Sequence, residues 1–128
     1  RKIMKTIINS ENAPAPIGPY SQAVLAGNTL FASGQIAINP ATGELEMSTI
    51  EIETEQVMQN IKAVLEEADM TFENIVKCSI FLSSMDSFSR VNEVYGKYFP
   101  SNPPARETVE VSCLPKSVNV EISFIAIK

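Results

Sequence analysis

The clearest periodic pattern along the chain predicts a helix over residues 51–69. Apolar residues recur there at offsets of 0, 4, 7, 8 and 11, which places them on one face of an α-helix. Polar and charged residues fill most positions between them. The apolar face consists of Val57, Ile61, Val64, Leu65 and Ala68. The pattern therefore predicts an amphipathic helix that covers part of a sheet.

A second, shorter helix is predicted to begin near residue 87. Asp86 or Ser87 can cap its first turn, because short polar side chains accept hydrogen bonds from free backbone N–H groups. The cluster of Pro100, Pro103 and Pro104 then ends the helix. Its apolar stripe consists of Phe88, Val91, Val94, Tyr95 and Tyr98.

Shorter apolar runs between turn-forming residues predict a set of β-strands. The three prolines and the glycine of residues 12–20 forbid regular structure and predict a stiff loop, while Gly27 and Asn28 predict a hairpin turn. The expected strands are residues 5–8, 22–25, 29–38, 75–82, 107–111 and 118–127. Together these elements predict a single α+β domain over residues 1–128, a mixed sheet with both helices packed on one face.

Two of the expected strands carry apolar residues on both faces. Residues 75–82 and 118–127 have apolar side chains at positions of both parities, whereas a strand with one solvated face alternates. Two helices cover one face of a sheet, so the other face would expose more apolar surface than soluble monomers usually tolerate. We therefore expect a closed homo-oligomer whose sheets pack face to face, with sites between subunits.

Composition narrows the chemistry that the chain can support. The sequence has no histidine, which removes imidazole as a general base and as a metal ligand. The net charge of −5 disfavours binding to phosphate backbones, so no nucleic-acid partner is expected. The sequence has no nucleotide-binding loop and no cluster of metal ligands, so we expect neither a metal nor another cofactor.

Cysteine content and hydropathy favour a cytoplasmic protein. Cys78 and Cys113 are the only cysteines, which argues against a disulfide framework and for a reducing compartment. We interpret both as small buried side chains, because neither has a histidine partner or CxxC spacing. The apolar runs are too short for a signal peptide or a membrane span, so no membrane partner is expected.

Arg106 is the first candidate for a binding residue. It follows Pro103–Ala105 at the start of an expected strand, where a stiff backbone would hold the guanidinium ready to bind a carboxylate through two hydrogen bonds. Thr108 shares its strand face and could line the same pocket, whereas Glu107 points to the opposite side. The alternative interpretation is a surface arginine paired with Glu107 or Glu110.

Glu121 is the candidate for a proton-transferring residue. It lies in the apolar last strand between Val120 and Ile122, so we expect its side chain in a partly dry space. Burial raises the pKa of a carboxyl group and a nearby guanidinium lowers it again, so the balance could leave a carboxylate that accepts a proton from water. The alternative is a structural ion pair across an interface.

Three further residues are candidates for lining a ligand site. Tyr20 ends the stiff loop and could present its hydroxyl group to a substrate, although a lone tyrosine is often a packed rim residue. Ser33 and Gly34 interrupt an apolar strand. Glycine there either lets the backbone approach a ligand closely or forms a β-bulge.

Seven segments, in this order and spacing, resemble the RidA/YjgF family from end to end. They are Ala15–Gln22 (APIGPYSQ), Ser33–Gln35 (SGQ), Asn60–Glu67 (NIKAVLEE), Val91–Tyr95 (VNEVY), Pro104–Arg106 (PAR), Leu114–Lys116 (LPK) and Val120–Ile122 (VEI). The resemblance implies a chorismate-mutase-like α+β fold. It also implies a homotrimer that forms a central β-barrel, with sites in the clefts between subunits.

The resemblance further implies an activity and the residues that carry it. The activity is deamination of reactive 2-imino acids, 2-iminobutanoate or 2-iminopropanoate, to 2-keto acids and ammonia. Arg106 would bind the substrate carboxylate, and Glu121 would activate or position water. The lining and contact residues that the resemblance implies are Tyr20, Ser33, Gly34 and Asn92.

The sequence departs from the family pattern directly after the arginine. Deaminating members usually have a small residue there and often cysteine next, whereas this chain has Glu107 and Thr108. Strand alternation should turn Glu107 away from the cleft, and threonine is close to cysteine in shape, so we expect an imine deaminase. One alternative is a module that binds a small carboxylate and regulates a partner without turnover. A second alternative is an RNA-directed or chaperone-like role, which the acidic net charge of the chain disfavours.

Overall fold

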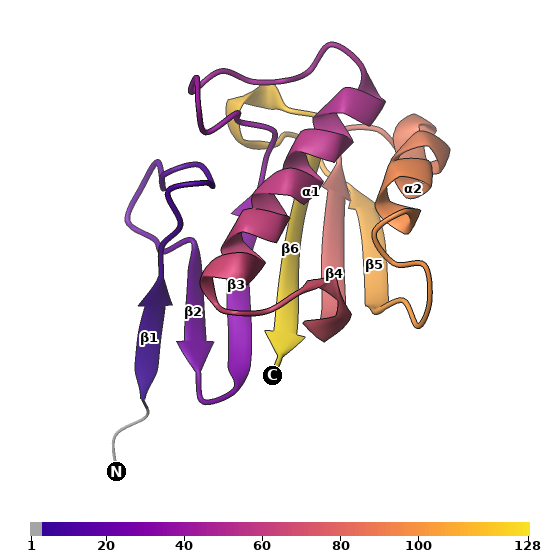
Figure 1. The fold of residues 1–128 in the computed structure, drawn as a ribbon. Helices are drawn as coiled ribbons and strands as arrows, with labels where there is room; N and C mark the ends of the chain where they lie inside the picture. Colours follow the sequence, from indigo (N-terminus) through magenta and orange to yellow (C-terminus); the bar gives the residue numbers. More distant parts are fainter. Residues whose placement is uncertain (1–3) are drawn as a thin grey trace.

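The chain folds into one six-stranded sheet with two helices on a single face (Figure 1). The computed structural model describes residues 4–128. The spatial strand order is β1-β2-β3-β6-β4-β5, and β4–β5 is the parallel pair in an otherwise antiparallel sheet. The elements are β1 (Lys5–Ile8), β2 (Ala23–Ala26), β3 (Thr29–Gln35), α1 (Ile50–Glu67), β4 (Ile75–Leu82), α2 (Phe88–Gly96), β5 (Ala105–Glu110) and β6 (Val120–Ile127). The predicted α+β class is confirmed.

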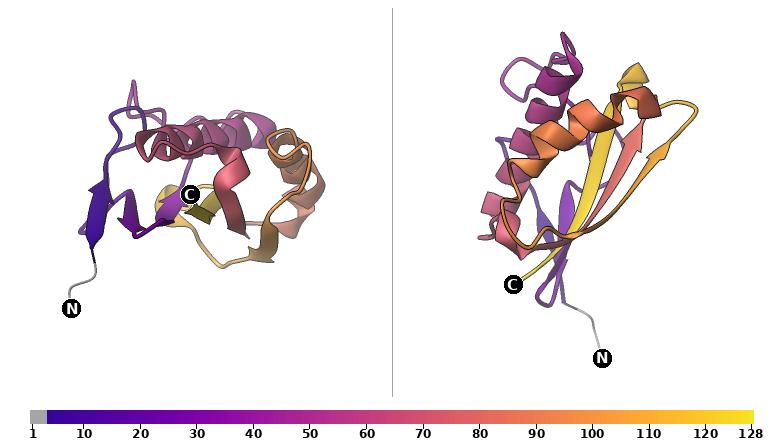
Figure 2. Two further views of the ribbon diagram at one scale, coloured as in Figure 1. Left: turned by 60° about the horizontal axis from the view of Figure 1, so that its bottom comes forward. Right: turned by 90° about the vertical axis from the view of Figure 1, so that its right-hand side faces the viewer.

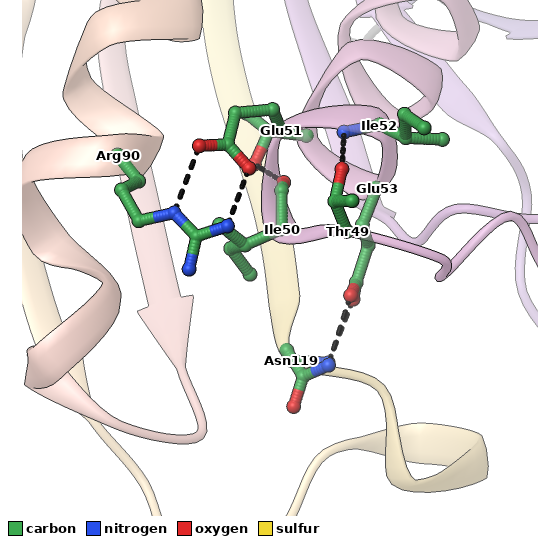
Figure 3. Close-up of polar contacts among 8 residues, drawn as sticks. Thr49, Ile50, Glu51, Ile52, Glu53, Arg90 and Asn119 are labelled. Carbon is green, nitrogen blue, oxygen red and sulfur yellow. Dashed lines mark hydrogen bonds and ion pairs between the residues drawn. The ribbon is translucent and has the colours of Figure 1, made fainter.

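Both predicted helices form, but the cap expected for α2 is wrong. The Thr49 side chain accepts a 3.1 Å hydrogen bond from the Ile52 N–H and thereby caps α1 (Figure 3). A short 3-10 turn, η2 (Met85–Ser87), precedes α2, and Ser84 caps that turn instead. Neither Asp86 nor Ser87 caps α2 with its side chain, because the 3-10 turn runs directly into the helix.

The strand boundaries differ from the predicted ones where the sheet is irregular. The pairing of β3 with β6 shifts between Ala32 and Gln35 and resumes at Gln35, where β3 ends instead of at residue 38. Beyond it, Ile38 forms an isolated bridge to Leu45. β5 begins two residues earlier than predicted, because Ala105 already pairs with β4. A bulge of this kind was one of the two interpretations of the Ser33–Gly34 interruption.

The main core lies between the two helices and one face of the sheet (Figure 2). β6 shows the alternation most clearly, because its buried residues are separated by half-exposed ones. Those buried residues are Val120, Ile122, Phe124 and Ala126. On the facing side of α1, Val57, Met58, Ile61, Val64 and Leu65 are fully buried. The predicted helical face is therefore the face that packs on the sheet.

Neither α1 nor α2 covers the opposite face of the sheet, where a small cluster of Ile36, Leu114 and Val118 packs against Phe81 of β4. Register places Val24, Phe31 and Ile125 side by side on neighbouring strands of this face. Phe31 is 49% exposed and Val109 of β5 is 42% exposed. The predicted second apolar face is therefore present, and the oligomer that would cover it stays a prediction.

The two cysteines differ in their environments. Cys78 is buried in the core as predicted, and burial raises the pKa of its thiol. Cys113 is exposed in the loop after β5, so the prediction that it is buried is wrong. Its thiol donates to the Leu114 carbonyl oxygen at 3.4 Å. No helix within residues 4–128 is long and apolar enough to cross a bilayer.

Candidate functional site

The sheet divides the predicted site residues into two groups on opposite faces. Arg106 of β5 pairs in register with Cys78 of β4, and Glu121 of β6 pairs with Phe81 of the same strand. Paired residues share a face of the sheet, and Cys78 and Phe81 lie an odd number of positions apart. Within one chain, the Arg106 and Glu121 side chains therefore leave the sheet on opposite sides.

The Arg106 guanidinium lies on the helix side of the sheet, held against α2. Its Nη1 donates a 2.7 Å hydrogen bond to Oδ1 of Asn92. The guanidinium carbon lies 5.0 Å from the ring centre of Tyr95 and 5.6 Å from that of Phe88, within the range of cation–π attraction. All three partners belong to α2, so one helix fixes the direction of the cation.

Arg106 forms no ion pair within the described part of the chain. Glu107 points to the other face of the sheet, as strand alternation predicted, and does not contact the guanidinium. There its carboxyl group lies 2.9 Å from Lys77 Nζ and accepts a hydrogen bond from Ser79. Glu110 accepts instead from the Met85 N–H. The alternative of a surface ion pair to Glu107 or Glu110 is therefore wrong.

An open pocket of about 510 Å³ adjoins the guanidinium, and we call it the Arg106 pocket. Its other lining residues are Asn92, Tyr95, Gly96, Phe99, Pro103 and Pro104. Thr108 shares the strand face but does not line this pocket. The hydroxyl groups of Thr108 and Tyr95 are both buried and have no hydrogen-bond partner within residues 4–128. Asn92 and Arg106 thus line the same pocket, whereas Thr108 does not line it.

Glu121 lies in a second pocket, of about 340 Å³, which we call the Glu121 pocket. The other lining residues are Ile17, Tyr20, Ser33, Gly34, Ile36 and Pro115, so three of the predicted site residues gather here. Burial raises the pKa of the Glu121 carboxyl group. No cation of the described chain offsets that shift, because the expected guanidinium lies across the sheet.

Gly34 provides the space that the Glu121 carboxyl group occupies. A Cβ atom added to Gly34 would overlap a carboxylate oxygen of Glu121 and would lie 2.7 Å from its Cδ. Tyr20 is 47% exposed, and its hydroxyl oxygen accepts a hydrogen bond from the Ile17 N–H at 3.3 Å. The Ser33 hydroxyl donates to the Ser21 carbonyl oxygen at 2.6 Å and thereby ties β3 to the preceding loop.

Gln22 shapes this loop, and the sequence analysis missed it. Its buried side-chain oxygen accepts from the Ser10 N–H at 2.6 Å, and its amide nitrogen donates to the Ser10 and Pro14 carbonyl oxygens at 3.0 and 2.9 Å. These bonds fasten the segment that leads to Tyr20. The sequence signal was the side-chain amide of Gln22 at the start of an apolar strand. That signal does not reveal its hydrogen-bond partners, which lie eight to twelve residues earlier in the chain.

Comparisons with known proteins agree along almost the whole chain. A family model described as "Endoribonuclease L-PSP" matches residues 10–128. "Reactive Intermediate Deaminase A, chloroplastic" from Arabidopsis thaliana is 40% identical over 124 residues, which cover 97% of this chain and 66% of that protein. No group of metal-ligating side chains was found within residues 4–128.

Two solved structures extend the agreement to three dimensions. A protein of unknown function of the conserved Rid family, YyfA from Yersinia pestis, is 50% identical with a TM-score of 0.95, covering 98% of this chain and 100% of that one. TdcF from E. coli, solved with bound serine, is 36% identical with a TM-score of 0.92, covering 96% and 98%. The fold is thus that of the Rid proteins. The chain belongs to the Endoribonuclease L-PSP family, also called the YjgF/RidA family.

Proposed function

We propose that the protein hydrolyses 2-imino acids, such as 2-iminobutanoate and 2-iminopropanoate, to 2-keto acids and ammonia without a cofactor. The observation that carries the proposal is Arg106, a guanidinium that is fixed in direction, opens on a pocket and pairs with no carboxylate among residues 4–128. Such a cation is suited to bind the carboxylate of a small substrate. The Arabidopsis relative named as a reactive intermediate deaminase supports the same class of reaction.

The catalytic site in this proposal is shared between two subunits of a homotrimer. Arg106 and Glu121 lie on opposite faces of their own sheet, so one substrate molecule cannot reach both groups in one chain. A neighbouring chain whose Glu121 pocket meets the Arg106 pocket would bring the two groups together. Burial of the exposed apolar sheet faces of the subunits in a central barrel supplies the driving force for such an assembly.

The reaction then needs orientation and one proton-transfer group. Arg106 holds the carboxylate, with Asn92 fixing the guanidinium, so that the imine carbon faces the Glu121 carboxylate of the neighbouring chain. Glu121 takes a proton from water as the oxygen bonds to the imine carbon, and it passes that proton to the imine nitrogen. The resulting carbinolamine loses ammonia and leaves the 2-keto acid. Such proton transfer contributes about 10²–10⁴ in rate.

The test of the function is a coupled assay with Arg106→Met. A pyridoxal-phosphate-dependent dehydratase generates the 2-imino acid, and semicarbazide traps what has not been hydrolysed. Wild-type protein should reduce the trapped product, whereas loss of a charge-assisted anchor should lower kcat/KM by at least about 100-fold. Arg90→Met is the matched control, because Arg90 is an exposed arginine paired with Glu51 away from both pockets. Unchanged trapping with folded wild-type trimer would refute the proposal.

Glu121→Gln separates an enzyme from the alternative, a module that binds a small carboxylate and regulates a partner. In the enzyme the variant should still bind a 2-keto acid but lose rate. Glu121 acts in its deprotonated form, so the wild-type rate should rise with pH through its pKa. Burial raises that pKa and the guanidinium of the neighbouring chain opposes the shift, so the rise should follow the Glu121 pKa of the assembled protein, and the variant should lack the rise. A pure binder would show no rate to lose.

Gly34→Ala should lower activity without unfolding the protein. The added methyl group would displace the Glu121 carboxyl group, which lies at the end of a flexible side chain and can move at little cost. We expect kcat to fall by roughly 10–100-fold, because a misplaced proton-transfer group is ineffective. Thermal denaturation should give nearly the wild-type midpoint. Full activity of the folded variant would show that the position of Glu121 is unimportant.

RNA cleavage, the activity in the family's name, fits the chain poorly. The net charge of −5 gives the protein no overall positive potential to attract a polyanion, and without histidine it lacks the usual general base. The open face of the sheet carries the ion pair Lys77–Glu107 and the Glu121 carboxyl group instead of a basic patch. The site therefore supports a small anionic substrate better than a polyanion.

A further inference from the structure

A small cavity adjoins the Glu121 pocket, and we call it the Gln35 cavity after one of the residues that line it. It lies beyond the Ala23–Ala32 pair, where the loop that leads to Tyr20 takes the place of β2 beside β3. Its volume is about 30 Å³. Four residues line both the cavity and the Glu121 pocket, so they form the wall between the two spaces. They are Ile17, Tyr20, Gly34 and Ile36.

Gln35 brings a polar group without a protein partner to this cavity. The residue is 6% exposed, and its side-chain amide forms no hydrogen bond with another group of residues 4–128. Gln22 lines the same cavity, but its amide already bonds to the backbone of Ser10 and Pro14. Buried polar groups nearly always have a hydrogen-bond partner, which is either protein or ordered water. Gln35 is therefore the amide in the cavity wall that is free to bind water.

The cavity has the size and the polar groups that a bound water molecule requires. A water molecule needs at least about 10–15 Å³ of free volume and two to four polar partners. The volume of about 30 Å³ meets the first condition. For the second, the Gln35 amide offers a donor and an acceptor. The Tyr20 hydroxyl group, whose oxygen accepts from the Ile17 N–H, still has its own hydrogen to donate.

We propose that Gln35 holds a water molecule in this cavity and that this molecule replaces the water that Glu121 deprotonates in each turnover. The inference rests on the proposed function, because it assigns a positioning residue to the same site. Gln35 pairs in register with Ile122, which directly follows Glu121 in β6. Gly34, which precedes Gln35, adjoins the Glu121 carboxyl group and has no side chain to separate it from the cavity.

The shared site explains why an internal water supply is needed. In that site the substrate and the neighbouring chain close the outer side of the Glu121 pocket, so bulk water cannot approach the imine carbon from there. Water held by Gln35 lies on the inner side of the same pocket. A water molecule that is already oriented by hydrogen bonds also reacts from a fixed position, which lowers the entropic part of the barrier.

Gln35→Met is the variant that tests this role. Methionine has about the same length as glutamine and adapts its shape to apolar surroundings, but it offers neither the donor nor the acceptor of the amide. Since the amide has no protein partner to leave unpaired, the variant should fold and keep at least the wild-type thermal midpoint. Gln59→Met is the matched control, because Gln59 is exposed on α1 and lines neither the Gln35 cavity nor the Glu121 pocket.

The experiment combines crystallography with the semicarbazide assay. A high-resolution crystal structure of wild type should show an ordered water molecule within hydrogen-bonding distance of the Gln35 amide, and that of Gln35→Met should lack it. In the assay, kcat of Gln35→Met should be at least about tenfold below wild type. Its affinity for pyruvate, measured by calorimetry, should change less than about twofold, because Arg106 still binds the carboxylate. Gln59→Met should match wild type throughout.

Three results would overturn the inference while leaving the proposed function intact. One is a wild-type rate in Gln35→Met, and another is a wild-type crystal structure without water at the Gln35 amide. The third is a parallel loss of kcat, pyruvate affinity and thermal midpoint, which would make Gln35 a structural residue. If wild type hydrolyses no 2-imino acid, the proposed function fails and the role in supplying water fails with it. The crystal structure then decides only whether Gln35 binds water.

Discussion

Mixing two inactive variants, Arg106→Met and Glu121→Gln, should restore about a quarter of wild-type activity. Each variant alone lacks one of the two groups in every site. In a random mixture, a site regains both groups when the chain that supplies Arg106 carries the Glu121 substitution and its neighbour carries the Arg106 substitution. Each condition holds for half of the chains, which gives the expected fraction. The reason is the placement of the two side chains on opposite faces of one sheet.

The measurement requires mixed oligomers whose composition is known. Co-expression with two different affinity tags, followed by native mass spectrometry, would establish how many chains of each kind every oligomer contains. Mixing Arg106→Met with the double variant Arg106→Met/Glu121→Gln is the control and should remain inactive. If verified mixed oligomers recovered no activity, both groups would have to act within one chain, and the shared site would be abandoned.

The sequence predicted those parts of the fold that local patterns encode. The periodicity of Val57, Ile61 and Leu65 defined α1 almost to its ends, because one helical face must pack against the sheet. The end of β3 was not predictable in the same way. It depends on a register shift against β6, and the apolar residues continue past Gln35 to Ile38 without any local signal that the pairing has stopped.

For the candidate site, too, the sequence predicted what depends on one strand and not what depends on the pairing of several strands. Alternation within β5 predicted that Arg106 and Glu107 face opposite ways, and the Lys77–Glu107 ion pair on the far side agrees. The relation between Arg106 and Glu121 depends on the registers of β5 with β4 and of β4 with β6. No single strand contains that information, so the sequence could not predict the separation of the two groups.

Replacing Glu53 should cause a large loss of stability, although the residue lines neither pocket. Its fully buried carboxyl group accepts hydrogen bonds from the Asn119 and Val120 N–H groups at 2.7 and 3.0 Å. It also accepts one from the Asn119 side chain at 2.9 Å (Figure 3). Glu53→Ala would leave these donors unpaired and open a cavity, at a cost of about 3–5 kcal/mol. Glu53→Gln should cost about 1–3 kcal/mol, because its amide nitrogen cannot accept.

Urea denaturation at one fixed protein concentration would measure these losses, since the stability of an oligomer depends on concentration. Glu67→Ala is the matched control, because Glu67 is an exposed glutamate at the end of the same helix and should change the free energy of unfolding by less than about 0.5 kcal/mol. A wild-type midpoint for Glu53→Ala would mean that water or a rearranged chain replaces the carboxyl group.

Glu53 should also influence catalysis, because it fixes the backbone next to the proton-transferring group. Val120, whose N–H donates to Glu53, directly precedes Glu121 in β6. At a temperature where Glu53→Gln is fully folded, we therefore expect kcat to fall while the affinity for a 2-keto acid, which the proposed shared site assigns to Arg106 of another subunit, stays nearly constant. A parallel loss of both would indicate a general distortion of the subunit. A loss of kcat alone would identify the α1–β6 contact as the support of the Glu121 half of the site.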